Sequence, residues 1–231
     1  MMGDLLSIGL YTPTEAGRLL RITPQKISRW LRGHSVGDRA YPALWHPEVT
    51  LDDGSLYLGF RDLMEIRVAD KLIGMGLSAQ KVRVAIQKAR TVMGEIYPLS
   101  TERFQTDGRS IFLRIAAEEP EAGEREHLLN LFAGQYEFKQ IIEPLLKTVD
   151  LDDKGHPAQW WPDGRKNQIL VDPRRAFGQP IDAESSVPTA ILAMAGERDG
   201  IQQAARDYDV SEAAVRRALA FEAGLEQRTA A

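Results

Sequence analysis

The sequence predicts a mainly α-helical protein with small β-hairpins, and three observations lead to that prediction. Residues 11–33 follow the pattern of two short helices joined by a tight turn, and residues 201–221 follow the same pattern. Asp-Gly pairs at 53–54 and 107–108 stand between apolar runs and predict hairpins, because glycine tolerates the positive φ of tight turns. With 231 residues, the chain has room for more than one compact domain.

The first helix pair has clear start and stop signals. Thr12 or Pro13 begins the first helix, and Thr23 followed by Pro24 begins the second, since Thr is a good N-cap and Pro suits the first helical position. Gly33 ends the second helix. The residues expected to face the core recur at one-face spacing: Ala16, Leu19, Leu20, Ile27, Trp30 and Leu31.

A hairpin and a second helical pair are expected next. The β-like stretches 41–49 and 55–60 flank an Asp-Asp-Gly turn and predict a hairpin of the kind called a wing. Its acidic tip would repel phosphate, so contact between this wing and DNA stays an open alternative. Helical patterns then cover 60–75 and Ser78 to residue 93, with Ser78 as an N-cap.

The middle of the chain mixes apolar and acidic segments. Residues 103–115 predict a second hairpin, and the acidic segment 118–126 predicts a loop. Helical stretches are expected over 127–132 and 139–146. The irregular run 150–164 marks a candidate domain junction.

The last third begins with a short strand and a turn-rich loop over 167–180, and helices follow over 188–195, 201–208 and 211–221. Together these elements predict a DNA-binding winged helix–turn–helix domain over 1–93, a region with a hairpin and acidic helices over 94–165, and a small three-helix domain over 166–231.

The net charge of −4 is distributed unevenly along the chain. Residues 12–39 carry six Lys/Arg against two Asp/Glu, and residues 61–92 carry seven against three, so each segment is +4. Residues 115–164 carry four against eleven, which gives −7. A cationic first third can bind a polyanion, while the acidic middle meets a different partner.

Burial of the apolar positions turns a polar face of the second helix outward. In the major groove an exposed helix of this length presents Arg to guanine, Gln to adenine, and Lys or Ser to phosphates. The alternative is an ordinary solvated face on a small helical domain. The residues predicted to bind double-stranded operator DNA are Gln25, Lys26, Ser28, Arg29, Arg32 and the flanking Arg39.

Three other features allow two interpretations each. The helix pair over 201–221 lies in a net-negative segment; it either packs against a subunit or partner, or touches phosphates through its arginines. Trp160-Trp161 covers either a partner or a seam between domains. The apolar stretch 128–132 belongs either to the core or to an interface.

Catalytic and metal-binding patterns are absent from the sequence. The four His are far apart, and the absence of Cys excludes disulfides and thiolate ligands. The run 150–155 resembles a calcium loop but has Lys154 and Trp161 where oxygen ligands are needed. Phosphate-loop, dinucleotide and serine-hydrolase motifs are missing. We therefore expect no enzyme activity, no cofactor and no metal, and the lack of a signal peptide or membrane span predicts a cytoplasmic protein.

The N-terminal part resembles MerR-like winged helix–turn–helix regulators. The resemblance lies in the motif T-x-x-E-A-x-R-L-L-x-I-x-P-x-x-I-x-R-W between Tyr11 and Trp30, and it continues over 58–68 and 74–83. The tail, over 169–182, 187–190 and 204–222, resembles the small helix–turn–helix domain of antitoxins that accompany ribonuclease toxins.

The combination resembles VapB-type antitoxins whose toxins are PIN-like nucleases. The resemblance implies a homodimer that represses its own operon and sequesters a co-expressed toxin. Two departures are the unusual length of the chain and the lack of an evident disordered tail that would fold on a nuclease. The alternative is a MerR-like transcriptional regulator without a toxin, in which the C-terminal half binds a small molecule or another protein.

Overall fold

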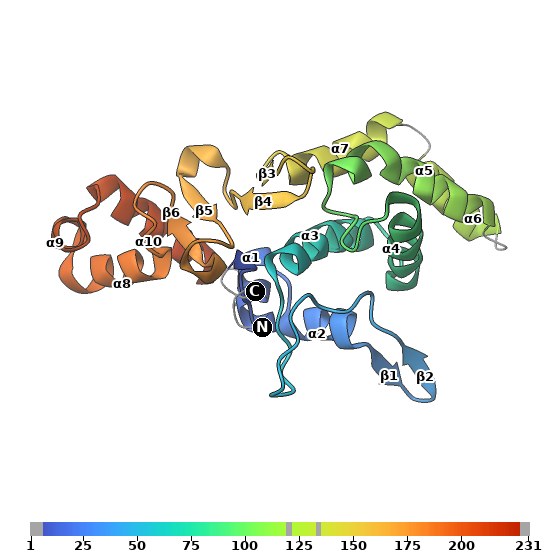
Figure 1. Cartoon of the computed structure of the whole chain (residues 1–231), viewed down its shortest axis with the longest axis horizontal. Helices are drawn as coiled ribbons and strands as arrows, with labels where there is room; N and C mark the ends of the chain where they lie inside the picture. The colour runs from blue at the N-terminus through green and yellow to red at the C-terminus, as the bar shows by residue number, and fades with distance from the viewer. Residues whose placement is uncertain (1–6, 119–121, 133–134, 227–231) are drawn as a thin grey trace. The chain divides into compact units, whose positions relative to one another are not determined.

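The computed structural model describes residues 7–118, 122–132 and 135–226, and in these ranges it contains ten α-helices and six short strands (Figure 1). The predicted fold class, mainly α with small β-hairpins, is confirmed. The chain divides into two compact units. Unit 1 comprises Met1–Ile27, Val49–Phe60 and Ala158–Ala231, and unit 2 comprises Ser28–Glu48 and Arg61–Pro157. These units group the chain differently from the predicted domains 1–93, 94–165 and 166–231.

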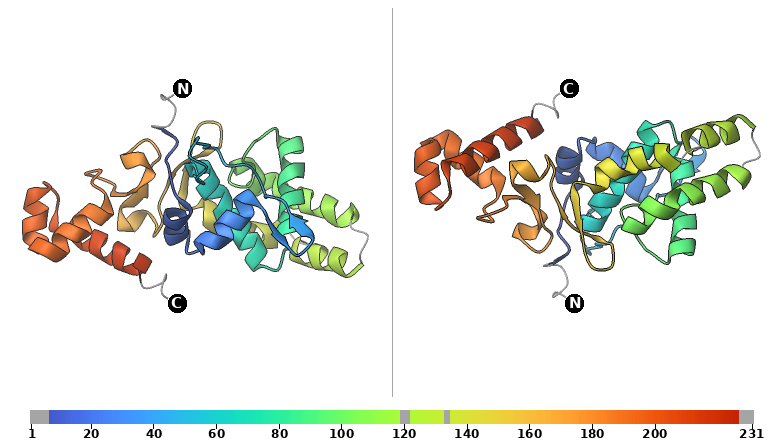
Figure 2. Two further views of the ribbon diagram at one scale, coloured as in Figure 1. Left: turned by 90° about the horizontal axis from the view of Figure 1, so that it is seen from below. Right: turned by 90° about the horizontal axis from the view of Figure 1, so that it is seen from above.

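Unit 1 combines a small sheet with a C-terminal group of three helices (Figure 2). Its elements are α1 (Pro13–Leu20), β4 (Pro157–Trp160), β5 (Ile169–Val171), β6 (Pro180–Asp182), α8 (Thr189–Asp199), α9 (Ile201–Asp207) and α10 (Glu212–Glu226). Strands β4, β5 and β6 are antiparallel neighbours, with Leu170 opposite Ile181. Helices α8, α9 and α10 pack around a small core of Ala195, Ala204, Ala205 and Val215. The three C-terminal helices expected from the sequence are thus present.

Unit 2 is built mainly from helices that pack on one another (Figures 1 and 2). Its elements are α3 (Phe60–Gly74), α4 (Ala79–Met93), α5 (Glu102–Glu118), α6 (Ala122–Phe132), α7 (Gln135–Leu146), β1 (His34–Val36), β2 (Arg39–Tyr41) and β3 (Val149–Leu151). The rings of Phe112 on α5 and Phe132 on α6 stack at 4.3 Å between centroids. The helical pair expected over 60–93 is confirmed, and the Ser78 side chain accepts the Lys81 amide as the predicted N-cap.

The predicted wing over 41–60 is wrong, and the hairpin lies earlier in the chain. Strands β1 and β2 pair antiparallel directly after α2 (Pro24–Arg32), with Ser35 opposite Ala40. The Asp53-Gly54 turn exists, since Asp53 accepts the Ser55 amide at 2.9 Å, but Leu58 beyond it forms a bridge with Tyr11. The Asp-Gly pair thus predicts the turn correctly, but Leu58 after the turn pairs with Tyr11 and not with the segment 41–49.

The predicted hairpin over 103–115 is also wrong, because this segment lies inside α5. The apolar residues bury one helical face despite the Asp107-Gly108 pair, and they recur at spacings of three and four: Phe104, Gly108, Ile111, Phe112, Ile115 and Ala116. The acidic loop expected over 118–126 is wrong at Glu118, which ends α5, and at 122–126, which belong to α6. Residues 119–121 lie outside the described residues.

The helices expected over 127–132 and 139–146 are confirmed as parts of α6 and α7. Leu128 and Phe132 are buried in unit 2, which favours the core interpretation of this stretch, although Leu129 is exposed. Trp160 is buried and lies opposite Val171 in the sheet, so both interpretations of the Trp160-Trp161 pair stay open. The Arg165 guanidinium lies over the Trp161 ring, 5.4 Å from the ring centroid.

Candidate nucleic-acid interface

The turn before the candidate recognition helix depends on the close approach of two backbone segments. A capping box begins α1: the Glu15 amide donates to the Thr12 hydroxyl, and the Thr12 amide donates to the Glu15 carboxylate at 2.8 Å. Arg21 adopts a left-handed conformation, with φ of 62°, and lets the Ile22 amide donate to the Gly17 carbonyl. A Cβ at position 17 would lie 2.5 Å from the Ile22 oxygen, so only glycine fits there.

Helix α2 begins at Pro24, as expected, and separates an apolar face from a polar one. Ile27, Trp30 and Leu31 are 0%, 7% and 3% exposed. The predicted DNA-binding residues lie on the remainder of the helix: Gln25, Arg29 and Arg32 are exposed, while Lys26 and Ser28 are half-buried. Gln25, Ser28, Arg29 and Arg32 recur at three- and four-residue spacing, which brings their side chains to one helix face.

The β1–β2 wing (His34–Tyr41) carries further cationic and aromatic groups. The His34 and Tyr41 rings stack at 4.9 Å, and the Arg39 guanidinium lies 5.4 Å from the Tyr41 centroid. Residues 34–40 are all exposed, with Val36 at 63%. Arg39, predicted as a flanking contact, is thus a wing residue. The sequence analysis did not assign His34 to the wing. The signal for it was its position directly after Gly33, which ends α2, so that His34 begins the next element.

Buried polar groups of unit 2 fix the segment that follows the wing. The Leu44 amide donates to the Trp30 carbonyl at 2.7 Å, which ties this segment to the end of α2. From α4, Arg83 donates to the carbonyls of Pro42 and Ala43. From α3, the buried Asp62 carboxylate accepts the Trp45 indole N–H at 2.8 Å and the Glu48 amide at 2.9 Å. No sequence motif pointed to Asp62 or Arg83, because their partners are 14 to 41 residues away.

The C-terminal helix pair uses a similar turn but presents a different surface. Asp209 is left-handed, and the Val210 amide donates to the Ala205 carbonyl. Two arginines that were candidates for phosphate contact form ion pairs within unit 1: Arg216 with Glu212 at 2.6 Å and Arg217 with the buried Asp182 at 2.9 Å. These pairs reduce the positive charge available to a polyanion and favour the alternative of a protein-binding or packing role.

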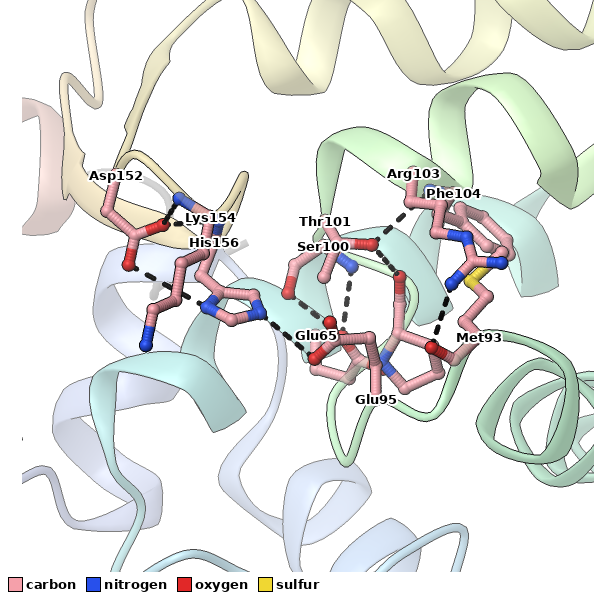
Figure 3. Close-up of polar contacts among 11 residues, drawn as sticks. Glu65, Met93, Glu95, Ser100, Thr101, Arg103, Phe104, Asp152, Lys154 and His156 are labelled. Atoms are coloured by element: carbon pink, nitrogen blue, oxygen red, sulfur yellow. Dashed lines mark hydrogen bonds and ion pairs between the residues drawn. The ribbon is translucent and has the colours of Figure 1, made fainter.

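Unit 2 also contains hydrogen-bonded ionisable groups that include a histidine, a serine and several carboxylates (Figure 3). The His156 ring lies between two carboxylates, at 2.9 Å from Glu95 and 3.7 Å from Asp152. The Ser100 hydroxyl instead donates to the buried Glu65 carboxylate, which also accepts the amides of Leu99 and Ser100. The Ser and His groups thus belong to separate hydrogen-bonded sets: the Glu65 set ties residues 99–100 to α3, and the His156 set joins the segments that contain Glu95 and Asp152.

Burial raises the pKa of Glu65 from 4.5 to about 7, against the lowering effect of its hydrogen bonds to Leu99 and Ser100. The folded chain therefore binds this proton more tightly than the unfolded chain does. Its contribution to stability is full below pH 4.5 and is lost as the pH rises through about 7, by roughly 3 kcal/mol in total. As the pH rises across this range, the free energy of unfolding, measured with denaturant, should fall less for Glu65→Gln than for the wild type. Equal falls in the two proteins would contradict the prediction.

Neither a metal centre nor a membrane span is found in the part of the chain that the structure describes. No group of three or more His, Asp or Glu side chains there is placed to hold a metal ion. Likewise, none of the described helices is long and apolar enough to cross a bilayer.

The fold and this surface define a mainly α-helical protein with helix–turn–helix elements in both its N-terminal and C-terminal parts. No protein-family model matches the chain. Over 223 residues the chain is 27% identical to a Mycobacterium tuberculosis protein that carries the provisional name antitoxin VapB45, across 92% of this chain and 93% of the relative. The crystal structure of Rv2018 from Mycobacterium tuberculosis shares the fold with a TM-score of 0.71 at 24% identity, covering 90% of this chain and 96% of that one.

Proposed function

We propose that this protein is the DNA-binding antitoxin of a type II toxin–antitoxin system, which represses its own operon as a homodimer and neutralises a PIN-like ribonuclease toxin. The observation that carries the DNA-binding part is the division of α2 into a buried apolar face and an exposed face with Arg29 and Arg32. An exposed helix with such side chains suits the major groove. The wing adds Arg39, which belongs to unit 2 together with Arg29 and Arg32 of α2.

The toxin-binding part is supported by the relative with the provisional name antitoxin VapB45, which is aligned over nearly the whole of both chains. The ion pairs of Arg216 and Arg217 agree with it, because pairing two of the three arginines of the C-terminal helix pair reduces the positive charge that it offers to DNA. In this proposal helix α2 and the wing that follows it bind the operator, and the C-terminal part of the chain binds the toxin.

Arg29→Ala should weaken operator binding by about 1–3 kcal/mol, or roughly 5- to 150-fold, because it removes an exposed guanidinium from the recognition face. Operator DNA is first located by footprinting on the upstream region of the gene, and affinities are then measured over a series of salt concentrations. If Arg29 binds a phosphate, the variant also lowers the slope of log K against log salt by about 1. Arg198→Ala is the matched control and should bind operator like the wild type, because Arg198 lies on α8, outside both helix pairs, with its side chain 68% exposed.

Wild-type affinity for Arg29→Ala would remove Arg29 from the interface. A homodimer should protect an inverted repeat whose half-sites are about 34–36 Å apart; one unpaired site would contradict the dimer. Co-expression with the product of the adjacent reading frame tests the remaining part. If no such product co-purifies, the alternative regulator without a toxin is favoured.

A further inference from the structure

Unit 1 contains a cavity of about 210 Å³ with a largely apolar wall. Helices α1, α8 and α10 and the segment before β6 surround it, and its wall includes Tyr11, Leu19, Pro180, Pro188 and Leu225. Small-molecule and cofactor sites usually measure roughly 300–1,000 Å³. The cavity is below that range, so its size suits one or two side chains of a protein partner better than a cofactor.

The polar part of the cavity is fixed and mainly acidic. Glu222, which is 8% exposed, pairs with Arg18 at 2.8 Å and accepts the Thr189 hydroxyl. Glu15 also lines the cavity, and Glu226 lies beside it, 3.8 Å from Arg18, with its side chain 76% exposed. Three carboxylates therefore accompany one guanidinium, and the surroundings of the cavity favour a cationic group on the partner.

An apolar stripe on α8 extends from the cavity. Ala190 lines the cavity and is exposed, and Ile191 and Met194 are 36% and 57% exposed. Residues three and four positions apart share a helix face, so Met194 lies one turn along from Ala190 and Ile191. Exposed apolar groups next to a pocket with an acidic edge are typical of a protein-binding surface, in which one partner side chain fills the pocket.

We propose that this cavity and the stripe formed by Ala190, Ile191 and Met194 are the toxin-binding surface: an apolar side chain of the toxin enters the cavity, and a neighbouring Lys or Arg of the toxin pairs with Glu226. The inference rests on the proposed antitoxin function. Charge complementarity supports the toxin as the partner of this surface. Residues 189–226 carry four Arg against seven Asp/Glu, a net −3, and would attract a cationic surface. A ribonuclease presents cationic groups to its polyanionic substrate, and an acidic surface can cover them.

The first test fills the mouth of the cavity. Ala190→Trp should weaken binding of the toxin, prepared as the product of the adjacent reading frame, by about 30-fold or more, because a bulky ring occupies the anchor site. Ala220→Trp makes the same change at an exposed α10 position outside the cavity lining and should bind within about twofold of the wild type. Both variants should retain operator affinity and the far-UV spectrum of the wild type, which separates loss of the site from loss of the fold.

A second measurement does not depend on a bulky substitution. The chain has no cysteine, so Ala190→Cys and Ala220→Cys each introduce a single thiol, whose alkylation is followed by mass spectrometry of this chain. Bound toxin should protect residue 190 and leave residue 220 reactive. In addition, Glu226→Lys should slow toxin association and reduce its dependence on salt, because it reverses the charge that attracts the partner.

The outcomes distinguish the two proposals. If the wild type binds the toxin and Ala190→Trp binds it equally well, with residue 190 reactive in the complex, the surface is wrong and the antitoxin function stands. Protection of residue 190 in the toxin-free protein that disappears on dilution would assign the surface to a second copy of the chain and overturn the inference. If the wild type binds no toxin, the antitoxin function and the inference both fail.

Discussion

Asp62→Ala should destabilise the protein by about 3–5 kcal/mol, the largest effect that we expect from a single substitution. The Asp62 side chain is 0% exposed and accepts hydrogen bonds from the Trp45 indole and the Glu48 amide. Alanine would leave the indole N–H, on a residue that is only 2% exposed, without this acceptor. Each buried donor that loses its partner costs about 1–3 kcal/mol, and the missing carboxylate leaves a cavity as well.

The destabilisation should be measured by denaturant unfolding, with Asp62→Asn as the matched variant. Asparagine keeps the volume and one acceptor oxygen, so its effect should be smaller than that of alanine. A second readout concerns Glu48, because burial and the Asp62 charge both raise the pKa of its carboxyl. Removing the Asp62 charge should lower the pKa of Glu48, as measured by NMR titration of the Asp62→Asn variant. If alanine and asparagine are both neutral, Asp62 does not hold the segment after the wing.

Gly33→Ala should cost about 2–4 kcal/mol and weaken operator binding, because position 33 combines two steric requirements. Gly33 has φ of +72°, a region that residues with a Cβ adopt at a cost of about 1–2 kcal/mol. In addition, the new Cβ would lie 2.6 Å from the Tyr41 carbonyl oxygen and 3.0 Å from the Ala43 nitrogen. Both contacts are with backbone, so the wing must shift relative to the end of α2, within unit 2, to accommodate the methyl group.

Gly37→Ala provides a control in the same hairpin. Gly37 also has positive φ, at +58°, but a Cβ there would meet nothing within 4 Å. The two variants therefore share the left-handed strain and differ in the backbone contact. Gly33→Ala should show the larger loss of stability by thermal unfolding and the larger loss of operator affinity. Equal effects would show that the contact with Tyr41 is relieved without moving the wing.

Local signals in the sequence were sufficient to predict the helix pairs. Thr12, Pro24 and Ser78 each fix a helix start within one or two residues, and their effect depends on neighbours in the chain. Long-range pairing was less predictable. The Asp53-Gly54 turn could be read correctly, yet the choice of Tyr11 as the partner of Leu58 is made by tertiary packing.

The segment 103–115 was mispredicted for a different reason. Two competing signals overlap there, an Asp-Gly pair typical of turns and an apolar pattern at helical spacing. Burial of Phe104, Ile111 and Phe112 on one face outweighs the cost of a glycine inside the helix, which is only about 1 kcal/mol. For the candidate interface, the exposed face of α2 follows directly from helical periodicity. The cavity lined by Tyr11 and Glu222 does not, because its walls come from distant parts of the sequence.

The two left-handed turn residues, Arg21 and Asp209, stand at equivalent places in their helix pairs. Each is followed by an amide that donates to the carbonyl five residues before it, Ile22 to Gly17 and Val210 to Ala205, and the next helix starts three residues after the left-handed residue. Backbone geometry alone therefore does not set what either pair binds. If the proposed function holds, exchanging surface charge between the two pairs should exchange their preference for nucleic acid and for protein, while both pairs keep their shape.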